Sequence, residues 1–205
     1  MLLDPKTVAD LAQPFLPQTY LRMMRVVHRA SPLGMGFGNT RFSSPNKTFQ
    51  LIYIARDLAT AIAETIVRDR FECVRDRVLD EPEIGEWVVC EVSATDPLLV
   101  LDLRTTGLLR PGVSTDASRA KVHAEGQTLS EEVYSTFDVG GLPYLSRLTA
   151  SECIAVYDRA VNIKLEASRS TELVCRPDLI PALRSGTPDA TRSFRFTGSP
   201  EELLH

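Results

Sequence analysis

The segment from Arg41 to Arg68 contains an arginine, a tyrosine and a glutamate whose side chains could together act on a nucleotide. Arg41 ends a glycine-rich stretch and precedes Phe42, and an arginine in such a loop can hold a phosphate through two parallel hydrogen bonds. Tyr53 lies in an apolar run, where a core tyrosine with a satisfied hydroxyl is the alternative to a ligand contact. Glu64 is a carboxylate that could act on the ribose of a bound nucleotide. These residue types indicate chemistry on the ribose of a phosphorylated nucleotide.

Neighbouring elements are expected to position these side chains. Residues 51–55 are β-branched, apolar and aromatic, which predicts a buried strand that carries the tyrosine. Asp57 is a suitable N-cap for a helix over about residues 58–70, a segment rich in alanine and isoleucine. On that helix Glu64 and Arg68 lie beside the apolar face, where an i,i+4 ion pair is the simplest interpretation. Glu64 can act in chemistry only if its side of the helix lines a cleft.

The rest of the chain mixes strand-like and helix-like segments. The expected strands are residues 21–29, 86–92, 98–103 and 153–157, and the expected helices are residues 5–13, 129–137 and 177–183. Residues 31–48 are rich in glycine, serine, proline and asparagine, which predicts a long loop, and such loops are often functional. Because the elements show no regular βα alternation, the fold class is predicted to be α+β.

Composition excludes several classes of function. The 205 residues fit one domain, and 43% hydrophobic residues suffice for a core. The net charge of −4 gives no basic surface for direct nucleic-acid binding, and no apolar run approaches membrane-spanning length. The four cysteines form no CxxC pair, so we expect no metal site and predict buried free thiols at Cys90 and Cys153. With no signal peptide expected, the cytoplasm is the predicted compartment.

Three motifs that resemble known catalytic signatures fail on their context. Residues 34–38 read GMGFG, but the dinucleotide pattern GxGxxG would require a glycine where Asn39 stands. His123 and Glu125 form the HxE of zinc deaminases without the PCxxC that must follow. No serine stands in a GxSxG elbow. A Rossmann enzyme, a zinc deaminase and an α/β-hydrolase are therefore not supported.

Taken together, the separate motifs resemble the RES domain family, named for an arginine, a glutamate and a serine. The resemblance covers roughly residues 20–165 and is most specific in the tyrosine-bearing strand followed by the alanine-rich helix with its glutamate. It rests on the following motifs: Arg-Val at 25–26, Arg-Phe at 41–42, Leu-Ile-Tyr at 51–53, Ala-x-Ala-x-x-Glu at 59–64 and Tyr-x-Ser-Arg at 144–147. Departures from the family pattern occur at Met24, at Asn39-Thr40 before Arg41 and at Leu145.

Residue by residue, the resemblance implies that Arg25, Arg41, Tyr53 and Ser146 bind NAD, with Arg29 as the alternative to Arg25. It implies a catalytic set of Glu64, Arg41, Tyr53 and Ser146. NAD would be the substrate, so no cofactor or metal is expected, and phosphate is a candidate co-substrate.

For the fold, the resemblance implies a single domain with a split, mostly antiparallel sheet flanked by helices, as in ADP-ribosyltransferases. The expected organisation is a helical segment over residues 1–19, a RES-like domain over 20–185 and a polar tail over 186–205. The implied function is that of a toxin that cleaves the nicotinamide–ribose bond of NAD as a glycohydrolase or phosphorylase. The implied partner is an Xre-type helix-turn-helix antitoxin, and homodimerisation is left open.

Three alternatives to this function are kept. The chain could be a protein ADP-ribosyltransferase, with a protein side chain as the acceptor. It could be a RES-like module that binds a nucleotide or a partner without turnover, or a plain α+β interaction protein. Saturable NAD binding without nicotinamide release would favour the binding module.

Overall fold

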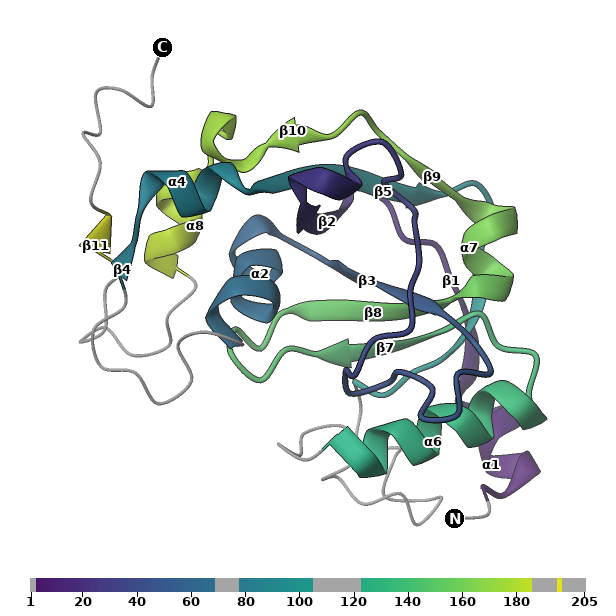
Figure 1. Cartoon of the computed structure of the whole chain (residues 1–205). Helices are drawn as coiled ribbons and strands as arrows, with labels where there is room; N and C mark the ends of the chain where they lie inside the picture. Colours follow the sequence, from purple (N-terminus) through teal and green to yellow (C-terminus); the bar gives the residue numbers. More distant parts are fainter. Residues whose placement is uncertain (1–2, 69–77, 105–122, 186–194, 197–205) are drawn as a thin grey trace.

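A computed structural model describes residues 3–68, 78–104, 123–185 and 195–196 of the chain. Within these residues, nine strands form one sheet at the centre of an α+β domain, with helices around it (Figure 1). Its strands are β1 (Ala12–Phe15), β2 (Tyr20–Arg25), β3 (Leu51–Ala55), β5 (Trp87–Ala94), β6 (Leu98–Leu101), β7 (Gly141–Leu145), β8 (Glu152–Tyr157), β9 (Leu165–Ala167) and β10 (Thr171–Glu172). β4 (Val78–Leu79) and β11 (Arg195–Phe196) form a separate parallel pair.

The sheet is almost entirely antiparallel. Its strand order is β1-β6-β7-β8-β3-β2-β5-β10, and β9 pairs with β5 as well. β6 and β7 run parallel, whereas the other described neighbours in this sheet run antiparallel. The prediction of an α+β domain with a mostly antiparallel sheet is therefore confirmed.

The sheet opens between β2 and β3. Six residues of β2 pair with β5 and five residues of β3 pair with β8, but β2 and β3 pair through Leu21 and Ala55 alone. Because the two strands diverge from this point, side chains occupy the space that a regular ladder of backbone hydrogen bonds would close. This opening corresponds to the split sheet that the family resemblance implies.

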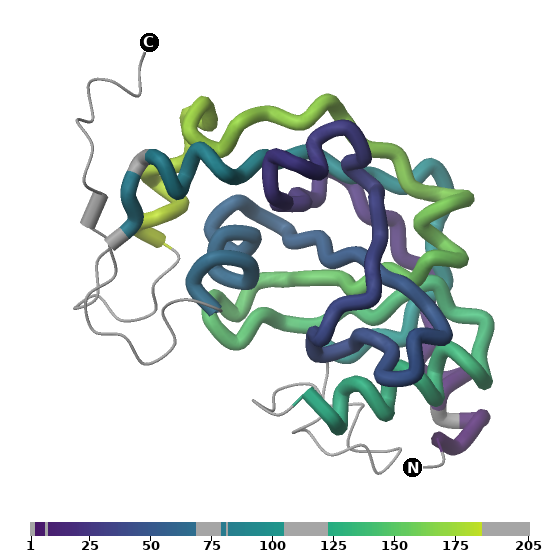
Figure 2. Tube along the Cα trace, viewed as in Figure 1, coloured from purple at the N-terminus to yellow at the C-terminus, as the bar shows by residue number. Residues whose placement is uncertain are grey.

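Helices cover both faces of the sheet (Figures 1 and 2). One face packs against α2, a following π-helix, α6 and α8, and the other face packs against α7. The helices are α1 (Pro5–Leu11), α2 (Leu58–Ile62), α4 (Glu81–Gly85), α6 (His123–Thr136), α7 (Asp158–Lys164) and α8 (Leu179–Ser185), with short 3-10 turns η1 (Val26–His28) and η4 (Leu173–Cys175) and the π-helix η2 (Ala63–Val67).

Near the candidate glutamate, β3 and α2 begin at the residues predicted from the sequence. β3 spans the predicted residues, and Asp57 caps α2 by accepting a hydrogen bond of 2.8 Å from the backbone N–H of Thr60. After Ile62 the helix changes from α to π hydrogen bonding. Single π turns inside helices are frequent at functional sites, and this one contains Glu64.

The strand predicted over residues 21–29 is shorter in the structure. β2 ends at Arg25, which pairs with Trp87, the first residue of β5. Because the partner strand begins only there, the chain beyond it turns into η1, and Val27 is 79% exposed.

Two further elements differ from the prediction. Within the described residues α6 spans His123–Thr136 rather than residues 129–137, and Thr128 lies inside it, donating from Oγ1 to the carbonyl of Ala124 at 2.8 Å. The segment that contains Pro14 forms strand β1, which pairs with β6 at the end of the sheet, where an edge strand tolerates proline. The N-terminal segment thus contributes a strand to the central sheet.

Other sequence expectations concern thiols, metals and membranes. Cys90 and Cys153 are buried free thiols, as predicted. Across the described residues, no group of three or more histidine, cysteine, aspartate or glutamate side chains is arranged to hold a metal ion. The helices in this part of the chain are all too short or too polar to cross a membrane. Cys73 and most of the predicted polar tail, residues 186–205, lie outside the described residues.

Candidate active site

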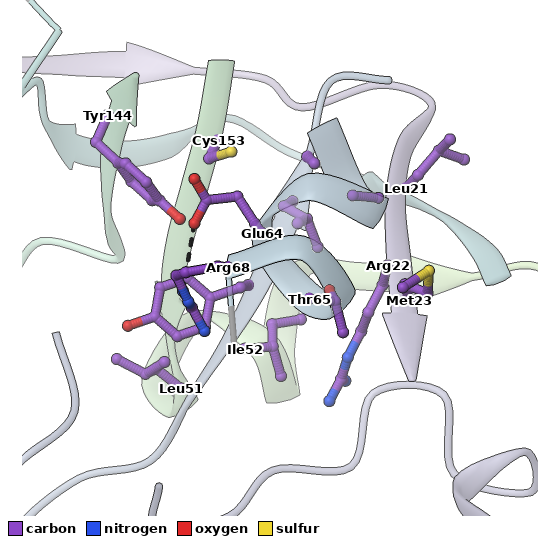
Figure 3. A pocket seen from close by; sticks show the side chains of 14 residues that line it. Leu21, Arg22, Met23, Leu51, Ile52, Glu64, Thr65, Arg68, Tyr144 and Cys153 are labelled. Atoms are coloured by element: carbon purple, nitrogen blue, oxygen red, sulfur yellow. Dashed lines mark hydrogen bonds and ion pairs between the residues drawn. The ribbon is translucent and has the colours of Figure 1, made fainter. Parts of the chain in front are cut away.

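A cavity of about 220 Å³ lies at the opening between β2 and β3, beside the π-helix η2 (Figure 3). Its walls come from both strands, from the helix and from the neighbouring strands β7 and β8. The residues that line it are Leu21, Arg22, Met23, Leu51, Ile52, Tyr53, Ile54, Ala55, Ala61, Glu64, Thr65, Arg68, Tyr144 and Cys153. The split in the sheet therefore coincides with a pocket that contains charged and aromatic side chains.

Glu64 occupies one wall of this pocket and is held at both carboxylate oxygens. Its Oε1 accepts a hydrogen bond of 2.7 Å from the hydroxyl of Ser146, and its Oε2 lies 3.3 Å from Nη1 of Arg68. The Glu64 side chain is 11% exposed, and its carboxylate lies between Tyr144 and Cys153 in Figure 3. The expected ion pair with Arg68 is present, and the helix side that carries it faces a cavity rather than open solvent.

Ser146 follows directly after β7 and is buried. Its Oγ accepts hydrogen bonds from the backbone N–H groups of Leu148 and Thr149, at 3.1 and 3.3 Å. Because a hydroxyl has a single proton, these contacts leave it for donation to Glu64. The turn after β7 thus orients Ser146 toward the carboxylate.

The ring of Tyr53 lines the pocket, whereas its hydroxyl forms hydrogen bonds with the loop before β3. The hydroxyl accepts a hydrogen bond of 3.0 Å from the backbone N–H of Phe42 and lies 2.8 Å from Oγ1 of Thr40. Burial raises the pKa of Tyr53, so the hydroxyl keeps its proton at neutral pH. The ring is the part of Tyr53 that is available to a ligand.

Arg41 lies behind the aromatic wall of the pocket. It is buried, with 6% of its surface exposed. The guanidinium carbon lies 5.5 Å from the centre of the Tyr144 ring and 5.9 Å from that of Phe42. Arg41 is not among the lining residues, so its charge reaches the cavity across Tyr144.

The structure does not bring Arg25 or Arg29 into the pocket. Arg25 lies over the Trp87 ring at 4.2 Å and forms an exposed ion pair with Glu86. Arg29 forms an exposed ion pair with Glu172 at 3.0 Å. Whether either arginine contributes to binding remains a prediction, but neither lines the cavity at the opening of the sheet.

Arg22 lines the pocket instead, and sequence reasoning missed it. Its two terminal nitrogens donate to the carbonyls of Pro32 and Gly34, at 2.7 and 2.6 Å, and thereby fasten the long loop to β2. Burial lowers the pKa of Arg22, but a guanidinium remains charged at neutral pH. The signal that could have found it is an arginine inside an apolar strand, between Leu21 and Met23.

The pocket combines charged groups of both signs with neutral polar groups. Among its lining residues, Arg22 and Arg68 carry positive charge and Glu64 carries negative charge. Burial raises the pKa of Tyr144 and of Cys153, and the neighbouring Glu64 carboxylate adds to both shifts. The phenol and thiol are therefore neutral at neutral pH, and the charge of the pocket is set by its arginines and its carboxylate.

The fold and the pocket define an α+β protein whose candidate active site lies where its central sheet opens. The family model described as the RES domain matches residues 22–174. The chain therefore belongs to the RES domain family. The matched region contains all the site residues predicted from the sequence, and it begins at Arg22.

The known proteins that are similar to this chain include the following two. "Probable toxin y4kH" of Sinorhizobium fredii (strain NBRC 101917 / NGR234) is 36% identical over 80 residues, which are 38% of this chain and 63% of that protein. The match thus spans less than two thirds of this relative's length. A chain in the crystal structure of the M. tuberculosis MbcT–MbcA toxin–antitoxin complex superposes with a TM-score of 0.62. That match is 16% identical and covers 83% of this chain and 93% of the other, and it shows a shared fold.

Proposed function

We propose that this protein is the toxin of a toxin–antitoxin pair and that it consumes NAD by cleaving the nicotinamide–ribose bond. The observation that carries the proposal is a carboxylate, Glu64, held by Ser146 and Arg68 in a pocket at the opening of the sheet. Membership of the RES domain family and the similarity to a protein named as a probable toxin support it.

Glu64 would act on the ribose. Cleavage of a glycosidic bond develops positive charge on the sugar ring, and a fixed carboxylate lowers the energy of that state. A carboxylate offers about four lone-pair positions, so contacts with Ser146 and Arg68 leave acceptor capacity for ribose hydroxyls. Nicotinamide in NAD is already a good leaving group, so the chemistry needs no strong general acid.

Arginines would bind the diphosphate, and tyrosines would contact the nicotinamide ring. Arg22 and Arg68 line the pocket, and a guanidinium matches the geometry of phosphate oxygens. The rings of Tyr53 and Tyr144 line the same cavity, and an aromatic face attracts a cationic ring such as nicotinamide in NAD. These contacts would place the scissile bond beside Glu64.

The size of the cavity limits how much of NAD it can enclose. Pockets that enclose drug-sized ligands measure about 300–1,000 Å³, whereas this cavity measures about 220 Å³. We therefore propose that the nicotinamide and its ribose enter the pocket, while the adenosine half remains outside it.

The proposal is tested by incubating purified protein with NAD and following free nicotinamide and the ribosyl product. Release of nicotinamide supports cleavage, and its absence at saturating NAD contradicts it. Omission of phosphate separates hydrolysis from phosphorolysis, and labelled NAD reveals transfer to a protein side chain.

An antitoxin is the proposed protein partner. A solved structure with the same fold comes from a complex described as toxin–antitoxin. We propose that an Xre-type antitoxin covers the opening near Arg41 and blocks NAD entry. A complex that leaves this opening accessible to solvent would contradict this mode of inhibition.

A further inference from the structure

The backbone of Phe42, the residue after Arg41, is held from two sides by hydroxyl groups. Its N–H donates to the hydroxyl of Tyr53 at 3.0 Å, and its carbonyl accepts from the hydroxyl of Ser130 at 2.8 Å. Tyr53 belongs to β3 and Ser130 to α6, so two separate elements fix the same residue of the loop. Phe42 itself is fully buried.

The hydrogen-bond directions around Ser130 follow from its single proton. Because that proton is donated to the Phe42 carbonyl, the Ser130 hydroxyl accepts from the hydroxyl of Tyr157, 2.9 Å away, which also donates to the backbone carbonyl of Ser130 at 3.3 Å. Ser130 and Tyr157 are both fully buried. Burial also raises the pKa of Tyr157, which keeps the donating proton in place. The result is a directed chain from Tyr157 through Ser130 to Phe42.

This series of hydrogen bonds ends at Phe42, next to the wall of the pocket, and does not enter the cavity. Neither Ser130 nor Tyr157 lines the cavity. The Phe42 ring packs edge-on against Tyr144, with ring centres 5.3 Å apart, and the Arg41 guanidinium lies over the same Tyr144 ring. The backbone position of Phe42 therefore determines where Arg41 stands relative to the pocket.

We propose that Ser130, oriented by Tyr157, is a positioning residue that sets the place of Arg41 for substrate binding. The role in binding rests on the proposed function and on the prediction that Arg41 binds NAD, whereas the role in holding the loop does not. Ser130 acts through Arg41, so loss of its hydroxyl should weaken the contribution of Arg41 and leave Glu64 and Ser146 in position.

The test compares Ser130→Ala with Ser135→Ala, a matched change on the same helix at an exposed serine that bonds only within α6. We expect Ser130→Ala to raise KM for NAD about tenfold, with kcat changed less than about threefold. Ser135→Ala should leave both constants unchanged. In an Arg41→Gln background, Ser130→Ala should cause no further rise in KM, because the residue through which it acts is already absent.

A purely structural role for Ser130 makes a different set of predictions. In that case Ser130→Ala would lower the thermal midpoint of unfolding, and it would raise KM by the same factor with or without Arg41. That additive result would overturn the proposal. Hydrogen exchange of residues 40–48 gives a measurement that needs no turnover, and Ser130→Ala should accelerate it. Unchanged exchange contradicts the hold on the loop, whereas absence of NAD cleavage by the wild type contradicts only the proposed function.

Discussion

Ser146 and Glu64 lie 82 positions apart in the chain, and their side chains are joined by a hydrogen bond of 2.7 Å. The bond connects the turn after β7 to the π-helix beside the opening of the sheet. It fixes one carboxylate oxygen of Glu64, while Arg68 contacts the other. A carboxylate fixed in this way loses little freedom when a substrate binds, which favours a role in positioning and charge stabilisation.

Replacement of Glu64 should remove activity and leave the fold intact. Glu64→Ala should abolish measurable NAD cleavage, and Glu64→Gln should lower kcat by roughly 10²–10³, the usual effect of losing one electrostatic contact to a transition state. Nicotinamide release measures both. Glu166→Gln, a change at an exposed glutamate of β9, is the control and should be neutral. Turnover near the wild-type rate by Glu64→Ala would refute the assigned role.

Removal of the Ser146 hydroxyl should affect both activity and stability. Ser146→Ala frees one oxygen of Glu64 and deprives two backbone N–H groups of their acceptor, which should reduce stability by about 1–3 kcal/mol. Its kcat should fall at least about tenfold. Urea unfolding and nicotinamide release measure the two effects, with the exposed Ser185→Ala as control. A stability loss without any change in kcat would make Ser146 purely structural.

Replacement of Arg22 and replacement of Arg25 should have different effects on KM for NAD, because only Arg22 lines the pocket. Arg22→Gln should raise KM for NAD about tenfold or more, since a charged hydrogen bond to phosphate is lost. Arg25→Gln should change KM less than about twofold, because Arg25 does not line the cavity and pairs with Glu86 at an exposed position. Steady-state kinetics with both variants decide the question. A larger effect at Arg25 would restore it as the first arginine of the site.

The ring and the hydroxyl of Tyr53 can be separated by mutation. Tyr53→Phe keeps the ring in the pocket but removes the acceptor of the Phe42 N–H, so stability should fall by about 1–3 kcal/mol. Tyr53→Ala should additionally lose the aromatic face and reduce kcat/KM further. Equal kcat/KM for the two variants would show that the ring contributes nothing to the reaction.

Stability should decline at alkaline pH. Burial raises the pKa of Tyr53, Tyr144 and Tyr157 above the value of about 10 that tyrosine has in an unfolded chain. The folded state therefore holds protons that the unfolded state releases, so the stabilisation is complete below about pH 10 and is lost as pH rises further. Urea unfolding at pH 8 and at about pH 10.5 should show this loss. Tyr157→Phe should show a smaller decrease between the two pH values than the wild type.

The local features of the site could be predicted from the sequence. The alternation of residue types around Tyr53, the cap at Asp57 and the i,i+4 spacing of Glu64 and Arg68 depend on neighbours within a few residues. Such features follow from backbone geometry and are visible in a pattern. The mixture of strand-like and helix-like segments was likewise enough to predict the α+β fold class.

Features that depend on distant contacts could not be predicted in the same way. Arg22 lines the cavity at the opening of the sheet and Arg25 does not, and the spacing along the chain does not reveal where the sheet opens. The pairing of Ser130 with Phe42 joins α6 to a loop 88 residues earlier, and a serine inside a helix carries no local sign of it. The change from α to π hydrogen bonding after Ile62 also left no mark in the apolar pattern.

Because only one pair of residues joins β2 to β3, the central sheet consists of two blocks of strands. β2 is anchored to β5, and β3 is anchored to β8, so each wall of the pocket belongs to a different block. A molecule bound between them would contact both and supply cross-links that the backbone does not. The two blocks already share the hydrophobic clusters on both faces of the sheet, so occupancy of the pocket should strengthen an existing connection between them.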